Sequence, residues 1–298
     1  MLKKHAFTLL EVAIAIIAIA LVAGVISVSK NLVSQSSNLV ALNQTDNNWE
    51  AATGSETVAE EVNEPELTVT SNLILWLDAD DDATISATGN QVTSWADKSG
   101  GNNDVAQTSS ANQPLTNSTS INGRNTLSFD GSNDYLEKNG VTLAHNNGNY
   151  NIFVVFATSN NDGGVLFNQS NTAYKHTNHY SGITGTNALY NDEWEPAGGG
   201  GSGGSVTLNE PTIVTYGRTG WSGRIYKNGN LVSTGATEAY AGNSNLHTHI
   251  AARFHLGSML APYGGQIGEM LVYSTYLSDT DRESVEAYLS EKWAITLD

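Results

Sequence analysis

Acidic residues on either side of one tryptophan form the first candidate site for chemistry. Residues 192–195 read Asp-Glu-Trp-Glu, and an extended backbone would place Glu193 and Glu195 on one face. A retaining glycosidase needs two carboxyl groups about 5 Å apart. Here Pro196 and a glycine run follow, and no β-branched residue flanks the acids, so a catalytic strand is disfavoured. We therefore expect no enzyme, but a ligand-binding loop in which Trp194 stacks on a sugar beside the two carboxylates.

Two further acidic groups supply the oxygen ligands that calcium prefers. One is formed by Asp78, Asp80 and Asp82, and the other by Asp130 and Asp134, which flank a glycine in a tight turn. The first group lacks the glycine and the distal glutamate of an EF-hand loop, so a solvated turn is the alternative. In the second group, aspartate side chains that accept backbone N–H groups in a turn are the alternative. Both groups are candidate calcium sites.

Histidines are the remaining candidate ligands. His247 and His249 lie two residues apart, so a strand would point both side chains to one face, and His176 and His179 lie in another region. The sequence places no third ligand beside either pair, so a two-histidine metal site is open but not favoured. A Ser-His-Asp arrangement and a G-x-S-x-G turn are not visible in the sequence.

The composition limits the classes of function. The chain has 298 residues, with 13 Lys and Arg against 30 Asp and Glu, which gives a formal charge of −17. Nucleic acids and anionic membrane surfaces need basic patches, so neither is expected as a partner. The sequence contains no cysteine, so the fold must depend on its own apolar core rather than on disulfides or a thiolate-bound metal.

From residue 67 onward, short apolar runs alternate with Gly, Asn, Asp and Ser clusters, which indicates an all-β domain. Ten or more strands without intervening helices predict a two-sheet antiparallel β-sandwich or jelly roll. Asn228-Gly229 predicts a hairpin turn because both residues accept positive φ, and the glycine-rich residues 198–205 predict a flexible connector. The predicted strands are 73–77, 92–95, 126–129, 135–137, 152–157, 165–168, 212–216, 223–227, 231–234, 251–256 and 267–273.

One short helix is predicted near the C-terminus. Ser278 is a suitable N-cap, and acidic residues follow it in the first turns. Val285, Tyr288, Leu289 and Trp293 then share one face. We expect this helix to pack on the outside of the sandwich.

The N-terminal part has a different character. Residues 7–26 are almost wholly apolar with Glu11 as the one charge, and about 20 residues at ~1.5 Å per residue span a bilayer. Two lysines before this run favour a cytoplasmic N-terminus. Helical spacing of apolar residues continues and predicts one long helix over 7–42, while the acidic residues 43–66 predict an extended linker.

The motif Ala-Phe-Thr-Leu-Leu-Glu at residues 6–11 resembles the leader junction of type IV pilins and of the pseudopilins of type II secretion systems. The resemblance implies a leader of residues 1–6, cleavage between Ala6 and Phe7, methylation of the new N-terminus, and pairing of Glu11 with a neighbouring subunit's terminal amine. Ala6 departs from the usual glycine. The implied partners are copies of the chain in a helical filament, a prepilin peptidase and a pilus or type II secretion assembly machinery. The alternative is an ordinary membrane anchor or an uncleaved signal peptide.

A second resemblance covers residues 67–298. It rests on five motifs that occur in this order: Leu-Ile-Leu-Trp-Leu-Asp-Ala at 73–79, Trp-Ala-Asp-Lys-Ser-Gly at 95–100, Leu-Ser-Phe-Asp-Gly-Ser-Asn-Asp-Tyr-Leu at 127–136, Tyr-Lys-Asn-Gly at 226–229, and Ile-Gly-Glu-Met-Leu-Val-Tyr at 267–273 followed by the helical residues up to 293. These look like the laminin-G-like, concanavalin A-like jelly roll. That fold hosts lectins, adhesion modules and glycosidases, and its members often bind calcium in loops.

Together these patterns predict a single-pass protein of the inner (cytoplasmic) membrane that becomes a cell-surface filament subunit. It would display a lectin-like sandwich for surface or glycan adhesion. The alternatives are a purely structural pilin with a non-binding sandwich and a membrane-anchored carbohydrate-active enzyme. Calcium is the one cofactor that the acidic groups suggest, and glycans are the expected ligands.

Overall fold

The computed structural model describes residues 64–140, 149–170, 177–192, 201–220, 222–236, 246–255 and 257–298. The chain divides into two compact units, Met1–Glu61 and Val62–Asp298, and every described residue belongs to the second. The predicted leader with Ala6 and Phe7, the helix over 7–42 with Glu11, and residues 43–63 of the linker lie outside the described residues. Within the described ranges, no helix has the length and apolarity that crossing a membrane requires.

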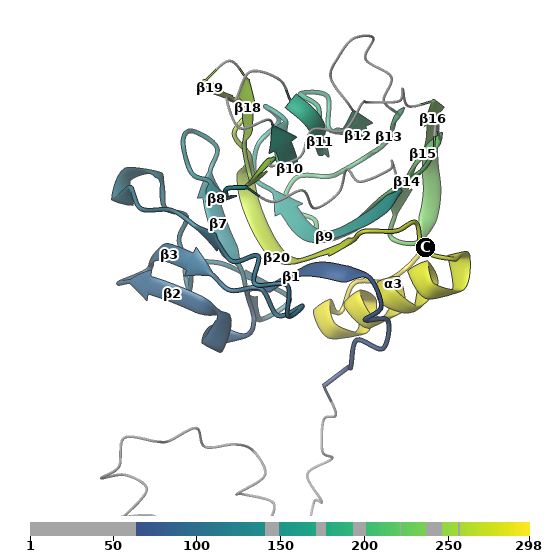
Figure 1. The fold of residues 1–298 in the computed structure, drawn as a ribbon, viewed down its shortest axis with the longest axis horizontal. Coiled ribbons are helices and arrows are strands. Elements are labelled where there is room, and N and C mark those ends of the chain that lie inside the picture. The colour runs from purple at the N-terminus through teal and green to yellow at the C-terminus, as the bar shows by residue number, and fades with distance from the viewer. Residues whose placement is uncertain are drawn as a thin grey trace, which may run out of the picture. The chain divides into compact units, whose positions relative to one another are not determined.

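Two antiparallel sheets make up the folded unit and confirm the predicted sandwich (Figure 1). The seven-stranded sheet has the order β1-β20-β9-β14-β15-β16, and β7 also pairs with β20. Its strands are β1 (Leu73–Asp78), β7 (Leu127–Asp130), β9 (Tyr150–Thr158), β14 (Thr212–Thr219), β15 (Ser222–Lys227), β16 (Asn230–Ala236) and β20 (Gly264–Tyr273).

The nine-stranded sheet has the order β13-β12-β11-β10-β17-β8-β4-β3-β2. Its strands are β2 (Ile85–Thr88), β3 (Gln91–Trp95), β4 (Val105–Ala106), β8 (Leu136–Lys138), β10 (Gly164–Ser170), β11 (Thr177–Ile183), β12 (Ala188–Asp192), β13 (Gly201–Ser205) and β17 (His247–Ile250). The smaller elements are the ladders β5 (Ser120–Ile121)–β6 (Arg124–Asn125) and β18 (Arg253–His255)–β19 (Ser258–Leu260), and the 3-10 turns η1 (Asp82–Thr84) and η2 (Ser110–Asn112).

The central strand β9 is buried on both faces, which explains why its sequence is a continuous apolar run. Ile152, Val154 and Phe156 belong to the core between the sheets. Phe153 and Val155 alternate with them and belong to a second apolar cluster, which includes residues of the C-terminal helix. Each face of the seven-stranded sheet therefore carries its own core.

The C-terminal helix α3 (Asp279–Trp293) covers the outer face of the seven-stranded sheet, as predicted (Figure 1). The Ser278 hydroxyl accepts a hydrogen bond from the backbone N–H of Asp281 at 3.1 Å, which is the expected N-cap. Trp293 lies so close to Gly268 of β20 that a Cβ there would be 2.5 Å from the indole Cη2. The helix thus docks where β20 lacks a side chain.

Two local predictions are correct only in part. The glycine-rich residues are not wholly a connector, because 201–205 form β13 beside β12. A Cβ at Gly203 would lie 2.6 Å from the Val232 carbonyl oxygen, so glycine permits the close approach of β16. The strand predicted over 251–256 is confirmed only as β18 at 253–255, because Ala251 has a φ of 68° and this bend separates β17 in the sheet from β18 in a hairpin.

Candidate functional site

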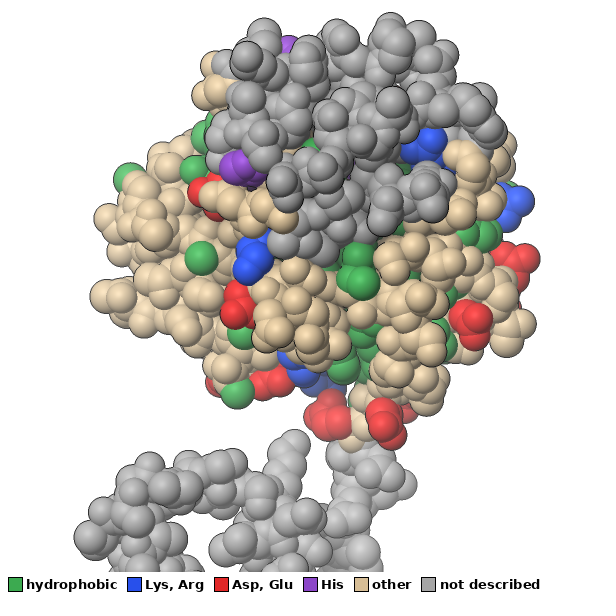
Figure 2. Space-filling view, in the orientation of Figure 1, with side chains coloured by type: hydrophobic (Ala, Val, Ile, Leu, Met, Phe, Trp, Pro, Cys, Tyr) green, Lys and Arg blue, Asp and Glu red, His purple; other side chains and the backbone are tan. Residues whose placement is uncertain are grey.

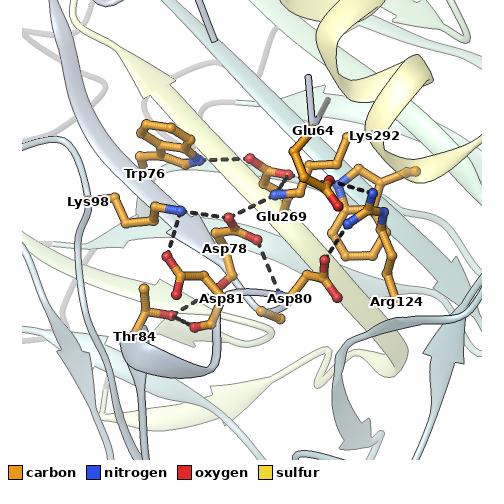
Figure 3. Close-up of polar contacts among 12 residues, drawn as sticks. Glu64, Trp76, Asp78, Asp80, Asp81, Thr84, Lys98, Arg124, Glu269 and Lys292 are labelled. Carbon is orange, nitrogen blue, oxygen red and sulfur yellow. Dashed lines mark hydrogen bonds and ion pairs between the residues drawn. The ribbon is translucent and has the colours of Figure 1, made fainter. Parts of the chain in front are cut away.

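The first predicted calcium ligand, Asp78, lies at the end of β1 between two lysines (Figure 3). Its Oδ2 atom is 2.8 Å from Lys98 Nζ and 2.7 Å from Lys292 Nζ. Burial alone would raise the pKa of Asp78, but the two ammonium groups lower it overall. This carboxylate is therefore charged and neutralised by the protein's own cations.

A second buried acid, Glu269 of β20, completes this network beneath α3. It is fully buried, and its Oε2 atom is 2.8 Å from the Nζ of Lys292. The indole nitrogens of Trp76 and Trp293 each donate to it at 2.7 Å, and the Tyr288 hydroxyl donates at 2.8 Å. Burial raises the pKa of Glu269, the nearby Asp78 carboxylate adds to the rise, and Lys292 opposes it. The network joins β1, β20 and α3, and its first role is structural.

The other acids of the first group have separate partners. Asp80 Oδ2 is 2.5 Å from Arg124 Nη1, and Glu64 Oε2 is 2.7 Å from Nη2 of the same arginine (Figure 3). Asp81 pairs with Lys98 at 2.8 Å, while Asp82 begins the 3-10 turn η1. The structure thus brings Asp78, Asp80 and Asp82 into one region, but it places a basic side chain against two of them. Calcium binding at this group stays a prediction.

The second predicted group has the geometry of a tight turn. Asp130 Oδ1 accepts hydrogen bonds from the backbone N–H groups of Ser132, Asn133 and Asp134, at 2.8, 3.1 and 3.3 Å. Asp134 Oδ2 accepts from the backbone N–H of Asp130 at 3.0 Å. Burial and the neighbouring Asp130 carboxylate raise the pKa of Asp134 to about 6. The two carboxylates are close enough to repel each other, so an added cation would relieve a real electrostatic cost.

A different group of side chains gathers on the outer face of the nine-stranded sheet. The Tyr180 hydroxyl of β11 donates to Asp192 Oδ2 of β12 at 2.6 Å, and these residues are cross-strand partners. The guanidinium of Arg253 lies 4.4 Å from the centroid of the Tyr180 ring, and Tyr190 meets that ring edge-on at 5.4 Å. We call these four residues the tyrosine–arginine cluster. Burial, together with the hydrogen bond to Asp192, raises the pKa of Tyr180, so its hydroxyl remains a donor.

The tyrosine–arginine cluster adjoins the predicted ligand-binding loop along the chain. Glu193, Trp194 and Glu195 lie outside the described residues, but they follow directly after Asp192 at the end of β12. The sequence predicts a binding loop there because acids and a tryptophan alternate in it, and this stays a prediction. Sequence reasoning missed Tyr180 and Arg253, since they are 73 residues apart along the chain and no local pattern relates them.

The histidines separate into two environments. His179 precedes Tyr180 and therefore points to the opposite side, between the sheets, where its ring nitrogens contact Tyr150 Oη at 3.0 Å and Ser181 Oγ at 2.8 Å. His247 and His249 share the outer face of β17, as the two-residue spacing predicts. The sequence found no third ligand, but the structure supplies one, because Glu137 of β8 lies opposite His249. His176 lies outside the described residues.

Figure 2 shows a described surface that is mostly uncharged, with acidic side chains in small groups and basic ones scattered among them. The visible face carries no broad basic area within the described residues. The excess of acidic side chains agrees with the formal charge of −17 of the whole chain.

Comparison with known proteins identifies the fold class. No protein-family model and no curated protein match the chain. Among solved structures, a Trypanosoma rangeli sialidase in complex with sialic acid matches at 13% identity and a TM-score of 0.51, over 76% of this chain and 34% of that one. The chain thus spans about a third of the sialidase structure. At this identity the likeness shows the fold alone, a β-sandwich.

Two smaller structures match with lower TM-scores. Domain 4 of an extracellular arabinanase from Geobacillus stearothermophilus, in complex with arabinotriose, matches at 14% identity over 70% of this chain and 96% of that one, with a TM-score of 0.48. The CBM40 of the Ruminococcus gnavus IT-sialidase, bound to an α2,3-sialyllactose, matches at 17% identity over 51% of this chain and 98% of that one, with a TM-score of 0.42.

Proposed function

We propose that the sandwich over residues 67–298 binds carbohydrate on the outer face of its nine-stranded sheet. The observation that carries this proposal is the tyrosine–arginine cluster, in which aromatic rings, a carboxylate and a guanidinium lie together on one face. Sugars present both C–H faces that stack on aromatic rings and hydroxyls that bond to charged groups. The loop with Glu193, Trp194 and Glu195 begins at this cluster and would add a further stacking ring.

A glycan array tests the carbohydrate proposal, with the full chain in detergent and with calcium present or absent. We expect Trp194→Ala and Arg253→Ala each to weaken binding to the preferred glycan at least about tenfold, which corresponds to about 1.4 kcal/mol. The matched control is Arg224→Ala, because Arg224 also lies over a tyrosine, 5.6 Å from the Tyr276 ring, but on the other sheet. Failure to bind any glycan under either condition would contradict the proposal and favour a purely structural coat.

The enzyme alternative has its own readout. Release of reducing sugar that disappears in Glu193→Gln or Glu195→Gln would identify a carbohydrate-active enzyme rather than a lectin. We expect no release, because the sequence around these acids is typical of a loop and not of a catalytic strand.

We also propose that the N-terminal part anchors the chain in the inner membrane and later assembles it into a filament at the cell surface. Support comes from the sequence: a basic leader, a small residue before Phe7, and Glu11 as the one acid in the apolar run. A buried acid needs a partner, and a neighbouring subunit's N-terminal amine would neutralise it. Filament growth would then bury the apolar helices against one another.

Two measurements test the assembly proposal. Glu11→Ala should leave the protein in the membrane but abolish filaments, whereas Glu50→Ala in the acidic linker should leave both unchanged. Mass spectrometry of the native protein should find a chain that begins at methylated Phe7. Normal filaments from Glu11→Ala would remove the role that we give to this acid.

A further inference from the structure

The pairing of β17 with β8 brings three metal-binding side chains together. His249 and Glu137 are direct cross-strand partners, so their side chains project from the same face of the sheet. His247 lies two residues before His249 in the same strand and projects from that face as well. One ligand atom from each residue lies within 4.8 Å of the other two, and His249 Nε2 is 3.6 Å from Glu137 Oε2.

These separations suit a small tetrahedral ion. Zinc binds imidazole nitrogen at about 2.0–2.1 Å and carboxylate oxygen at about 2.0–2.2 Å, so tetrahedral ligand atoms lie about 3.3–3.5 Å apart. The His249–Glu137 distance of 3.6 Å is already close to this value. Where two ligand atoms are as far apart as 4.8 Å, one side chain must move by about 1 Å to reach tetrahedral spacing. His247 and Glu137 are only half-buried, so side-chain rotation can supply it.

The surroundings hold the His249 ring in place. It is fully buried, with its ring centroid 4.5 Å from that of Phe254 and 6.3 Å from that of Tyr135. A buried histidine ring that is held by aromatic neighbours is already oriented toward a ligand on its open side.

A fourth residue gives an independent sign of a ligand at this place. Ser170 of β10 is the cross-strand partner of His247 and therefore lies on the same face. Its side chain is fully buried, and within the described part of the chain its hydroxyl has no hydrogen-bond partner. Buried hydroxyls are seldom left without a partner, because the lost hydrogen bond costs about 1–3 kcal/mol. A water molecule bound to a metal ion at His247 would supply one.

We propose that Glu137, His247 and His249 bind one Zn²⁺ ion and leave its fourth position open for water or an external ligand. Two imidazoles and one carboxylate form a donor set that zinc favours, whereas calcium and magnesium prefer six or more oxygen ligands. The site is separate from the aspartates of the predicted calcium sites, and it does not depend on carbohydrate binding. The competing interpretation is an ion pair between His249 and Glu137 without a metal.

Zinc titration of the full chain in detergent, after removal of metals with a chelator, tests the proposal. Calorimetry should show one zinc ion per chain. Cobalt bound in the same place should give the strong visible absorption of a tetrahedral site. Glu137→Gln and His247→Ala should each weaken zinc binding at least about tenfold, because even loss of an outer partner of a metal ligand costs about 10–100-fold. The matched control is His255→Ala in β18, which should bind zinc like the unmodified chain.

Several results would overturn the proposal. The first is that the metal-free chain binds no zinc. The second is that bound cobalt gives the spectrum of an octahedral site. The third is that Glu137→Gln and His247→Ala, tested separately, both bind zinc as tightly as the unmodified chain. Thermal unfolding of the metal-free proteins checks that each variant folds, and zinc, but not calcium or magnesium, should raise the midpoint of the unmodified chain. If a variant fails to fold, the stoichiometry and the cobalt spectrum of the unmodified chain still decide between an ion site and a plain ion pair.

Discussion

Replacement of Lys292 by methionine should destabilise the sandwich more than any other single loss of charge in the network beneath α3. Lys292 is 8% exposed and lies 2.7 Å from Asp78 and 2.8 Å from Glu269. Methionine keeps most of the apolar stem but removes the one cation that both buried acids share. Asp78 would retain Lys98, while the partners that Glu269 would keep among the described residues are neutral hydrogen-bond donors.

The expected decrease in the free energy of unfolding follows from the burial of Glu269, which loses its cation. Breaking a buried ion pair by removing one partner costs about 3–5 kcal/mol, because an uncompensated charge remains. We expect about 3 kcal/mol at pH 7, since Glu269 keeps three hydrogen-bond donors and can take up a proton. A loss of that size is a large fraction of the free energy of unfolding of an ordinary domain.

The pH dependence of the loss has a definite sign. The pKa of Glu269 in the folded protein is above its ordinary value of 4.5, and removal of Lys292 would raise it further. A group whose folded pKa is raised favours the folded state at low pH and disfavours it as the pH rises through the unfolded value. The variant should therefore lose less stability near pH 4 than at pH 7.

Urea unfolding followed by tryptophan fluorescence measures the loss, because Trp76 and Trp293 both donate to Glu269. The matched control is Lys98→Met. Lys98 also pairs with Asp78, at 2.8 Å, but its side chain is 26% exposed, so we expect a loss of about 1 kcal/mol. Equal losses in the two variants, or a larger loss at pH 4 than at pH 7, would refute the assignment of Lys292 as the central cation.

Three further substitutions test other parts of the structure. Asp134→Asn should raise the free energy of unfolding by about 1–2 kcal/mol at pH 7 and have little effect at pH 4. The reason is that the folded pKa of about 6 lies above the ordinary 3.8, so the charged form opposes folding as the pH rises between these values. Gly268→Ala should cost about 2–4 kcal/mol in urea unfolding, since its Cβ would be 2.5 Å from the Trp293 ring. Ala294→Gly should raise the midpoint of thermal unfolding and add about 0.5–1 kcal/mol to the free energy of unfolding. The reason is that Ala294 caps α3 with a φ of 50°, a left-handed conformation that glycine adopts without strain.

The sequence predicts the central part of this fold well because the signals there are local. The apolar run of β9, the Asn228-Gly229 turn with φ values of 46° and 83°, and the Ser278 cap each depend on neighbours in the chain. The polar strands β11, β12 and β13 lack such signals. The residues 177–183, Thr-Asn-His-Tyr-Ser-Gly-Ile, carry little of the apolar alternation that marks a half-buried strand.

The proposed zinc site could be predicted only in part, because the pairing of two distant strands brings its ligands together. His247 and His249 are visible as a pair, but Glu137 joins them through the pairing of β8 with β17, more than 100 residues away. In the same way, an acid inside the apolar run of β20 is a sign of a buried partner, yet nothing local identifies Lys292 as that partner. Residue spacing shows which side chains share a face, and only the fold shows which faces meet.

The two predicted calcium sites differ in whether basic side chains already pair with their carboxylates. This difference leads to one further prediction. Asp78 and Asp80 already pair with Lys98, Lys292 or Arg124. Within the described residues, Asp130 and Asp134 interact with backbone N–H groups and with each other. If calcium binds, it should bind at Asp130 and Asp134 and add about 2.7 kcal/mol to the free energy of unfolding at 100 times its Kd. Asp134→Asn should abolish that calcium-dependent gain, while Asp80→Asn should leave it unchanged. The opposite pattern would place the ion among the acids after β1 and show that calcium displaces the basic side chains there.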